Sequence, residues 1–183
     1  MPLVAVTAVG ADQPGIVAAV TRVFVDRGCN IEDSSMTILR GQFSMMLVVD
    51  APEGVAPADL EASLARPATD LDLVVACRAL GDAGPGPAAD AVTAGTRWTV
   101  SVYGADRPGI VNRVAELLAG DQVNIVDLST RVIGGPDRPV YAMILEVSVP
   151  AHADTDGLER RLHEVAAELG VDASLHPSDA DIL

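Results

Sequence analysis

The sequence contains no lysine, because all 12 of its basic residues are arginines, and these stand against 26 acidic residues for a net charge of −14. Nucleic-acid binding depends on clustered cations that neutralise phosphates. The only adjacent basic pair, Arg160 and Arg161, lies in an acidic stretch. The absence of lysine also excludes Schiff-base catalysis and a Walker A phosphate loop. We therefore expect no direct contact with nucleic acid.

Cysteines, aromatic residues and long apolar runs are also scarce. Cys29 and Cys77 form no CxxC motif, so we expect two small buried side chains and neither a disulfide nor a metal site. Aromatic residues make up 3% of the chain against 49% hydrophobic residues, so aliphatic side chains must fill the core. No stretch approaches the roughly 18 apolar residues of a membrane span. The run LVAVTAV after Pro2 is too short for a signal peptide. We expect a globular cytoplasmic protein without a membrane partner.

The main positive feature is an internal duplication. The segment GADQPGIV at residues 10–17 returns as GADRPGIV at residues 104–111. The correspondence extends without a gap over residues 7–33 and 101–127. A repeat this long exceeds the usual solenoid periods of about 20 to 50 residues, so it indicates two copies of a whole domain.

The segment between the copies has a different composition. Residues 81–96 are rich in Gly, Pro and Ala and show no apolar periodicity, which is typical of a flexible linker. We therefore expect one domain at residues 1–80 and a second at residues 97–183, joined by this linker.

Copy one begins with the pattern of a strand followed by a helix. The apolar run at residues 3–9 is typical of a central strand. From Ile16 to Phe24 the apolar residues recur at helical spacing. We expect Pro14 at the first helical position, where its missing N–H has no partner to lose, and Gly28 at the end of the helix.

The rest of copy one predicts a hairpin, a helix and a last strand. Alternation in FSMMLVVD places four apolar side chains on one face of a strand: Phe43, Met45, Leu47 and Val49. We expect a second helix that opens at Pro57 and stops at Pro67, followed by a strand within residues 71–80. Copy two repeats the order, with strands near 97–103, 124–133, 139–149 and 171–176 and a second helix near 155–169.

The order βαββαβ predicts an α+β fold with two ferredoxin-like domains in tandem. Because crossovers are right-handed, each domain should be a four-stranded antiparallel sheet with two helices on one face. The strongly apolar first and third strands should lie in the centre and the more polar second strand at an edge. The open sheet face and edges favour pairing, either of the two copies or of two chains in a homodimer.

The duplicated turn has the chemistry of a site for a zwitterion. A helix N-terminus presents unpaired N–H groups and a partial positive charge that attract a carboxylate, and Gly15 lets a ligand approach the backbone. Asp12 beside it suits an ammonium group. Asn30 carries both a donor and an acceptor. The same residue types also serve as ordinary helix caps and turns, so a purely structural role stays open.

The pattern G-A-D-x-P-G-I-V, an amphipathic helix and then N-I-x-D resembles the ACT domain, a βαββαβ module that senses amino acids, over most of both halves. The resemblance implies a ligand where two domains meet, next to the first strand-helix loop. By matching positions, the implied ligand-binding residues are Asp12, Pro14, Gly15, Ile16 and Asn30 in copy one and Asp106, Pro108, Gly109, Ile110 and Asn124 in copy two.

Two such domains without an attached enzyme or DNA-binding domain are similar to the glycine cleavage system transcriptional repressor family. That resemblance implies a non-enzymatic protein without a cofactor, which responds to glycine or serine and acts through a partner protein. Arg107 stands where copy one has Gln13, and Asn112 and Arg113 stand where it has Ala18 and Ala19. The two copies are therefore expected to differ in affinity, or only one of them binds.

Two other functions remain open from the sequence. Acylphosphatases share the arrangement of strands and helices, and their phosphate cradle needs an arginine in the first loop together with an asparagine. Copy two has Arg107 and Arg113 with Asn124, whereas copy one has no arginine between residues 10 and 21. The other alternative is a dimerisation or scaffolding module that binds no ligand.

Overall fold

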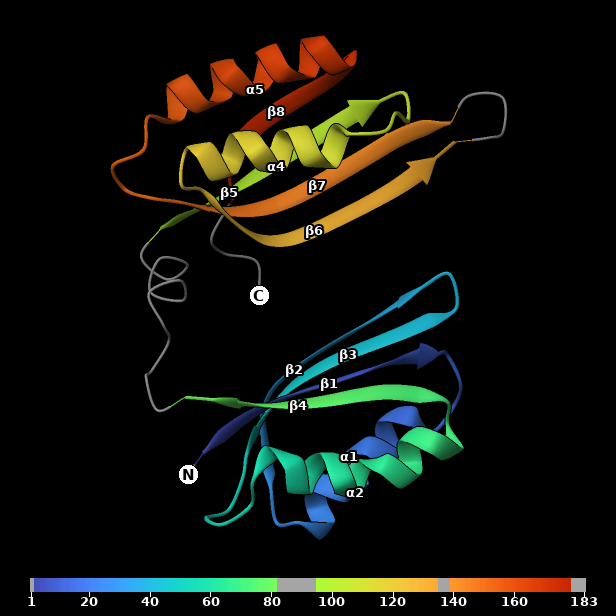
Figure 1. The fold of residues 1–183 in the computed structure, drawn as a ribbon. Coiled ribbons are helices and arrows are strands. Elements are labelled where there is room, and N and C mark those ends of the chain that lie inside the picture. Colours follow the sequence, from blue (N-terminus) through green and yellow to red (C-terminus); the bar gives the residue numbers. More distant parts are fainter. Residues whose placement is uncertain (1, 82–94, 135–138, 179–183) are drawn as a thin grey trace. The chain divides into compact units, whose positions relative to one another are not determined.

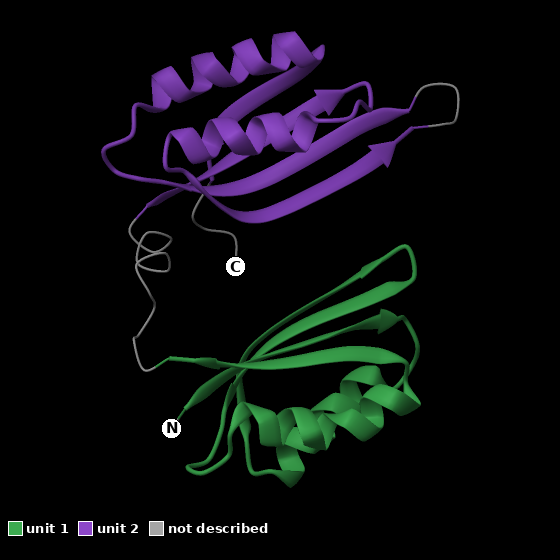
Figure 2. Ribbon diagram, viewed as in Figure 1, with its two compact units in different colours: residues 1–84 green, residues 85–183 purple. Residues whose placement is uncertain are grey.

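The computed structural model of the chain describes residues 2–81, 95–134 and 139–178. It divides into two compact units, Met1–Gly84 and Pro85–Leu183, which are coloured separately in Figure 2. Most of the expected linker, residues 82–94, lies outside the described residues. Within the described ranges, no helix has both the length and the apolar character needed to cross a bilayer.

Unit 1 is a four-stranded antiparallel sheet with two helices on one face (Figure 1). The strands pair in the order β2-β3-β1-β4, so β1 and β3 are central and β2 is an edge strand, as predicted. Its elements are β1 (Leu3–Ala11), α1 (Ile16–Asp26), β2 (Asn30–Leu39), β3 (Gln42–Asp50), α2 (Pro57–Asp70) and β4 (Leu73–Leu80).

Unit 2 repeats this arrangement with the strand order β6-β7-β5-β8. Its elements are β5 (Thr96–Gly104), α4 (Ile110–Gly120), β6 (Asn124–Ile133), β7 (Val140–Val149), α5 (Thr155–Leu169) and β8 (Val171–Pro177). The βαββαβ order and the tandem ferredoxin-like fold are therefore confirmed in both units.

The core of each unit lies between the sheet and its helices. In unit 1 the four β3 side chains predicted to share a face are all buried, with Met45 the most exposed of them at 6%. They meet α1 through Ile16, Val20 and Phe24. Burial of each such side chain contributes about 1.5–3 kcal/mol. In β1 and β3, buried side chains alternate with more exposed ones, and the more exposed ones lie on the sheet face that carries no helix.

Two predictions about proline were wrong. Pro14 is not the first helical residue, because α1 begins at Ile16 and Pro14 lies in the turn before it. Pro67 does not stop the second helix, which continues to Asp70. Pro67 has no N–H to donate to the preceding turn. Its own carbonyl still accepts a hydrogen bond from the N–H of Leu71 at 3.1 Å, which closes the last turn.

Candidate functional site

The turn that precedes α1 and α4 has one backbone geometry in both units. Gly15 has a φ of 99° and a ψ of −11°, and Gly109 has a φ of 96° and a ψ of −7°. These angles match the third position of a type II turn, which requires a positive φ, and proline commonly takes the position before it. The Pro-Gly pair therefore turns the chain sharply from the first strand into the helix.

The helix N-termini behind these turns are open. Within the described residues, no side chain caps α1 or α4. A Cβ atom built on Gly15 or Gly109 meets nothing within 4 Å. The first N–H groups of each helix thus carry partial positive charge toward free space, which is the arrangement that binds an anion such as a carboxylate.

The side chain before each Pro-Gly pair fixes the turn to the second helix. In unit 1 the Nε2 of Gln13 donates to the carbonyl of Leu71 at 2.8 Å. In unit 2 a guanidinium nitrogen of Arg107 donates to the carbonyl of Leu169 at 3.2 Å. Both carbonyls lie at the C-terminal end of a helix, where unpaired acceptors need a donor. The exchange of Gln13 for Arg107 therefore preserves an anchor of the turn.

The two acidic residues of the turn are exposed and differ in their surroundings. The backbone N–H of Asp12 donates to the carbonyl of Gly41 at 2.8 Å, which ties the turn to the β2–β3 hairpin. Asp106 lies near the Tyr141 phenol. Burial and the charge of Asp106 raise the pKa of Tyr141, while a hydrogen bond with Thr130 lowers it.

The remaining predicted residues of the turn offer mainly backbone to a ligand. Ile16 and Ile110 are each 2% exposed, because their side chains pack in the cores. Pro14 and Pro108 are exposed. A molecule at the turn would thus touch a proline ring, a glycine backbone and helix N–H groups.

Asn30 does not lie beside the turn of its own unit. It pairs with Asp50, which in turn pairs with Leu3 at the start of β1. The turn follows Ala11 at the other end of β1. At about 3.3 Å per residue, these ends are about 26 Å apart. The same register separates Asn124 from the turn of unit 2, because Asn124 pairs with Ser148 at the start of β5.

Sequence reasoning missed Asp50, the cross-strand neighbour of Asn30. Its Oδ1 is buried and has no hydrogen-bond partner within the described residues. A buried carboxylate oxygen without a partner is rare, and a water, an ion or a ligand that donates a hydrogen bond would satisfy it. In unit 2 the corresponding neighbour of Asn124 is Ser148, which is neutral and 2% exposed. Only strand register reveals the pair, since Asn30 and Asp50 belong to different strands.

The cradle expected of an acylphosphatase is not assembled in unit 2. Arg113 is paired with Glu168 at 2.9 Å and with Glu116 at 3.7 Å. Arg107 serves the C-terminus of α5, and Asn124 lies at the far end of the sheet. In the described ranges, no group of three or more acidic, histidine or cysteine side chains is placed to hold a metal ion.

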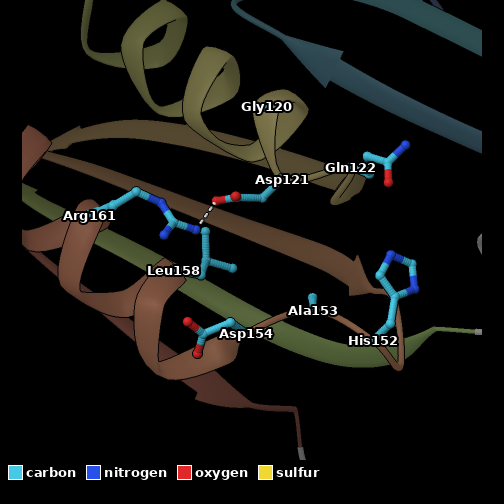
Figure 3. A pocket seen from close by; sticks show the side chains of 8 residues that line it. All are labelled: Gly120, Asp121, Gln122, His152, Ala153, Asp154, Leu158 and Arg161. Atoms are coloured by element: carbon cyan, nitrogen blue, oxygen red, sulfur yellow. Dashed lines mark hydrogen bonds and ion pairs between the residues drawn. The ribbon is translucent and has the colours of Figure 1, made fainter.

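A separate hollow of about 380 Å³ lies in unit 2 between the end of α4 and the start of α5 (Figure 3). Three of the charged side chains that line it, Asp121, Asp154 and Arg161, are engaged within the fold. Arg161 donates to Asp121 at 2.6 Å, and this hydrogen bond raises the pKa of Arg161. Asp154 accepts the N–H of Gly157 at 3.0 Å as the cap of α5. We therefore assign the hollow a structural role.

Comparison with known proteins places both units in one family. An ACT domain family model matches residues 3–78 and 97–176. The chain is 28% identical over 173 residues to the glycine cleavage system transcriptional repressor of Escherichia coli K12, which covers 93% of this chain and 87% of that protein. It is also 38% identical over 81 residues to a UPF0237 protein of Pyrobaculum aerophilum, covering 44% of this chain and 86% of that one.

A solved structure shares the complete arrangement. The crystal structure of a Galdieria sulphuraria protein matches with a TM-score of 0.78 at 24% identity, and the match covers 97% of this chain and 98% of that one. At this identity the likeness concerns the fold alone. Because the family model matches the sequence of both units, this chain belongs to the ACT domain family, and it is related to the glycine cleavage system transcriptional repressor.

Proposed function

We propose that this chain is a non-enzymatic cytoplasmic regulator that binds a small amino acid, glycine or serine, where two ACT domains meet, and passes the occupancy to a partner protein. The observation that carries the proposal is the open helix N-terminus behind Gly15 and Gly109, beside an exposed aspartate, in both units. The carboxylate of the ligand takes the helix N–H groups, and its ammonium takes the aspartate.

The ligand needs a second domain because one domain does not bring the predicted residues together. Asn30 lies about 26 Å from the turn of its own unit, at the opposite end of the sheet. β2 is an edge strand. Antiparallel pairing of two such edges places the start of one strand beside the end of the other, and that end adjoins the turn. Asn30 of one domain thereby reaches the turn of its neighbour.

Exposed apolar side chains along the edge strands support this pairing. Met36 and Ile38 on β2 are each 48% exposed, although their cross-strand partners Met45 and Phe43 are buried. On β6, Leu128 is 41% and Val132 is 52% exposed beside buried partners on β7. Each core therefore continues to an uncovered edge, which a second domain would cover.

A small amino acid such as glycine or serine is favoured, because the backbone donors and the aspartate of the turn contact the carboxylate and ammonium groups and require no large side chain. The name of the Escherichia coli relative, a repressor of the glycine cleavage system, points in the same direction. For regulation the ligand must prefer one domain arrangement, and a tenfold preference requires about 1.4 kcal/mol. A charge-assisted hydrogen bond is strong enough to supply it.

Calorimetric titration of the full chain with glycine, serine and the other common amino acids tests the proposal. Asp12→Ala and Asp106→Ala should each weaken binding by roughly tenfold or more, and the double variant should abolish it. Asp70→Ala is the matched control, since Asp70 is an exposed aspartate in a surface pair with Arg66. Retained affinity in the double variant would refute the site. Absence of heat for every amino acid would favour a scaffolding module.

A further inference from the structure

The sheet face of unit 1 that points away from α1 and α2 is uncharged at its centre. Strand register aligns its side chains in rows across the sheet, and two adjacent rows carry no charge. Three members are among the most exposed apolar residues of the unit, with Val74 at 75%, Met46 at 56% and Val9 at 44%. The uncharged rows consist of Ser35, Met46, Thr7 and Ala76, then Thr37, Ser44, Val9 and Val74.

The next row carries two opposite charges at its ends. Asp33 on β2 pairs with Val48, Val48 pairs with Ala5, and Ala5 pairs with Arg78 on β4. Asp33 and Arg78 therefore lie at opposite edges of the face at one level along the strands. Both are exposed.

The corresponding face of unit 2 carries charged side chains on its two central strands. Arg97 and Glu146 form an ion pair at 2.7 Å on the two central strands. The row that matches Asp33 and Arg78 runs from Asp127 through Glu146 and Thr99 to His176. Burial of this ion pair against an apolar surface would cost several kcal/mol of desolvation.

We propose that the open face of unit 1 is a dimer surface that packs against the same face of a second copy, with a twofold axis parallel to the strands. Such an axis places β2 of one copy over β4 of the other. Asp33 of each copy then meets Arg78 of its partner, so the pair forms twice. The two uncharged rows, with Met46, Val9 and Val74, meet in the middle.

The area of the sheet face and the net charge of the chain are both consistent with a second copy as the partner. Four strands of this length present about 500 Å² of face, so two faces bury about 1,000 Å², where specific interfaces begin. Two chains with a net charge of −14 repel each other over most of their surfaces. At the uncharged rows this repulsion is small, and Asp33 and Arg78 beside them attract their counterparts in the second copy. The proposal concerns the sheet face and is independent of ligand binding at the turns.

Sedimentation velocity of the full chain tests the surface. The wild-type protein should sediment as a dimer of two 18.9 kDa chains at micromolar concentration. Met46→Glu should raise the dimer Kd by roughly a hundredfold, because it buries two carboxylates in the uncharged rows. The matched control is Ile144→Glu, at the equivalent position of unit 2 with 46% exposure, which should leave the dimer intact. Circular dichroism verifies that both variants are folded.

A charge exchange tests the direction of the axis. Asp33→Arg and Arg78→Asp should each weaken the dimer at least tenfold, and the double variant should restore it. The proposal is overturned if the wild-type chain is monomeric, if Met46→Glu stays dimeric, or if Ile144→Glu dissociates the dimer equally. Failure of the double variant to restore association overturns the twofold geometry. If Met46→Glu does not fold, Val74→Glu at the sheet edge replaces it with the same expected dissociation.

Discussion

Unit 1 has Phe24 and Phe43 in its core where unit 2 has Leu118 and Tyr141, and all four are buried. The open faces differ as well, since Met46 and Val48 of unit 1 correspond to Ile144 and the paired Glu146 of unit 2. The turns nevertheless agree in φ within a few degrees, at 99° and 96°. Core volume and surface charge can be redistributed without loss of the fold, whereas the turn geometry is the same in both.

The chain carries a separate reporter for each unit. Trp98, the only tryptophan, lies on β5 of unit 2. The two cysteines, Cys29 and Cys77, lie in unit 1 and are free thiols. Tryptophan fluorescence therefore follows unfolding of unit 2, and thiol labelling follows unfolding of unit 1, in the same sample.

The largest effect is expected from a core truncation in one unit. Phe24→Ala removes a side chain that is 1% exposed and should cost unit 1 about 3–5 kcal/mol in unfolding free energy. In urea, thiol labelling should shift to lower concentration while the Trp98 transition stays in place. Leu118→Ala is the matched variant and should move only the Trp98 transition, by about 2–5 kcal/mol. Equal shifts of both reporters would show that the units unfold as one block.

A methyl group on the turn glycine should cost less. Gly15→Ala and Gly109→Ala meet no atom within 4 Å, so their effect arises from the positive φ alone, about 1–2 kcal/mol. Each should destabilise its own unit, as read by thiol labelling or by Trp98. Gly120→Ala at the end of α4, which also has open space, is the control and should be neutral or slightly stabilising. If Gly15→Ala were as stable as the wild-type chain, the positive φ at this position would impose no strain on alanine.

If the proposed function holds, substitutions of the residues that pair with Asn30 and Asn124 should change the affinity of one binding site without changing the other. Asp50→Ser makes the Asn30 end of unit 1 like that of unit 2 and should weaken amino-acid binding there by roughly tenfold, since a charged partner for the ammonium is lost. Ser148→Asp should strengthen amino-acid binding at the Asn124 end of unit 2. Titration calorimetry measures both. Unchanged affinities in both exchanges would remove Asp50 from the site.

The smallest expected effect is that of Cys77 ionisation on the stability of unit 1, which is absent at neutral pH. The counterpart of Cys77 in unit 2 is Leu175. Burial and the nearby Glu61 raise the pKa of Cys77 from 9.0 to about 11. At pH 7 the thiol is neutral in both states, so stability is unaffected. Between pH 9 and 11 the unfolded thiol ionises first, and the stability of unit 1 falls.

Cys77→Val should remove most of that decline. The chain has no lysine, and both tyrosines lie in unit 2, so the main other group of unit 1 that titrates in this range is Cys29, whose pKa is also raised by burial. Urea unfolding followed by far-ultraviolet circular dichroism at pH 8, 9, 10 and 11 measures the slope, with Cys29→Val as the control that keeps Cys77. A decline of equal size in Cys77→Val would contradict the assignment.

Much of the fold followed from local patterns. Alternation along FSMMLVVD identified the buried face of β3, and helical spacing from Ile16 to Phe24 identified the buried face of α1. The positions of prolines were less predictable. Pro14 belongs to a type II turn, whereas Pro67 lies inside α2. Pro67 removes only the N–H that would bond to the carbonyl of Ser63, and its own carbonyl still accepts the N–H of Leu71.

The candidate site was predictable only in part. The duplicated turn was visible as a repeated string, but the similar roles of Gln13 and Arg107 were not, since each depends on a carbonyl far away in sequence. Asp50 was invisible for the same reason. Its unpartnered oxygen is defined by the strands around it, not by neighbours along the chain.

Apolar periodicity and the repeated Pro-Gly turn were sufficient to specify two βαββαβ domains, because strands and helices bury one face at fixed residue spacing and a positive φ favours glycine. Strand register decided the rest. It placed Asn30 beside Asp50 and away from the turn, and it aligned Asp33 with Arg78 across the open face of unit 1. Those neighbours come from different strands, and only the hydrogen-bonded sheet determines which residues stand side by side.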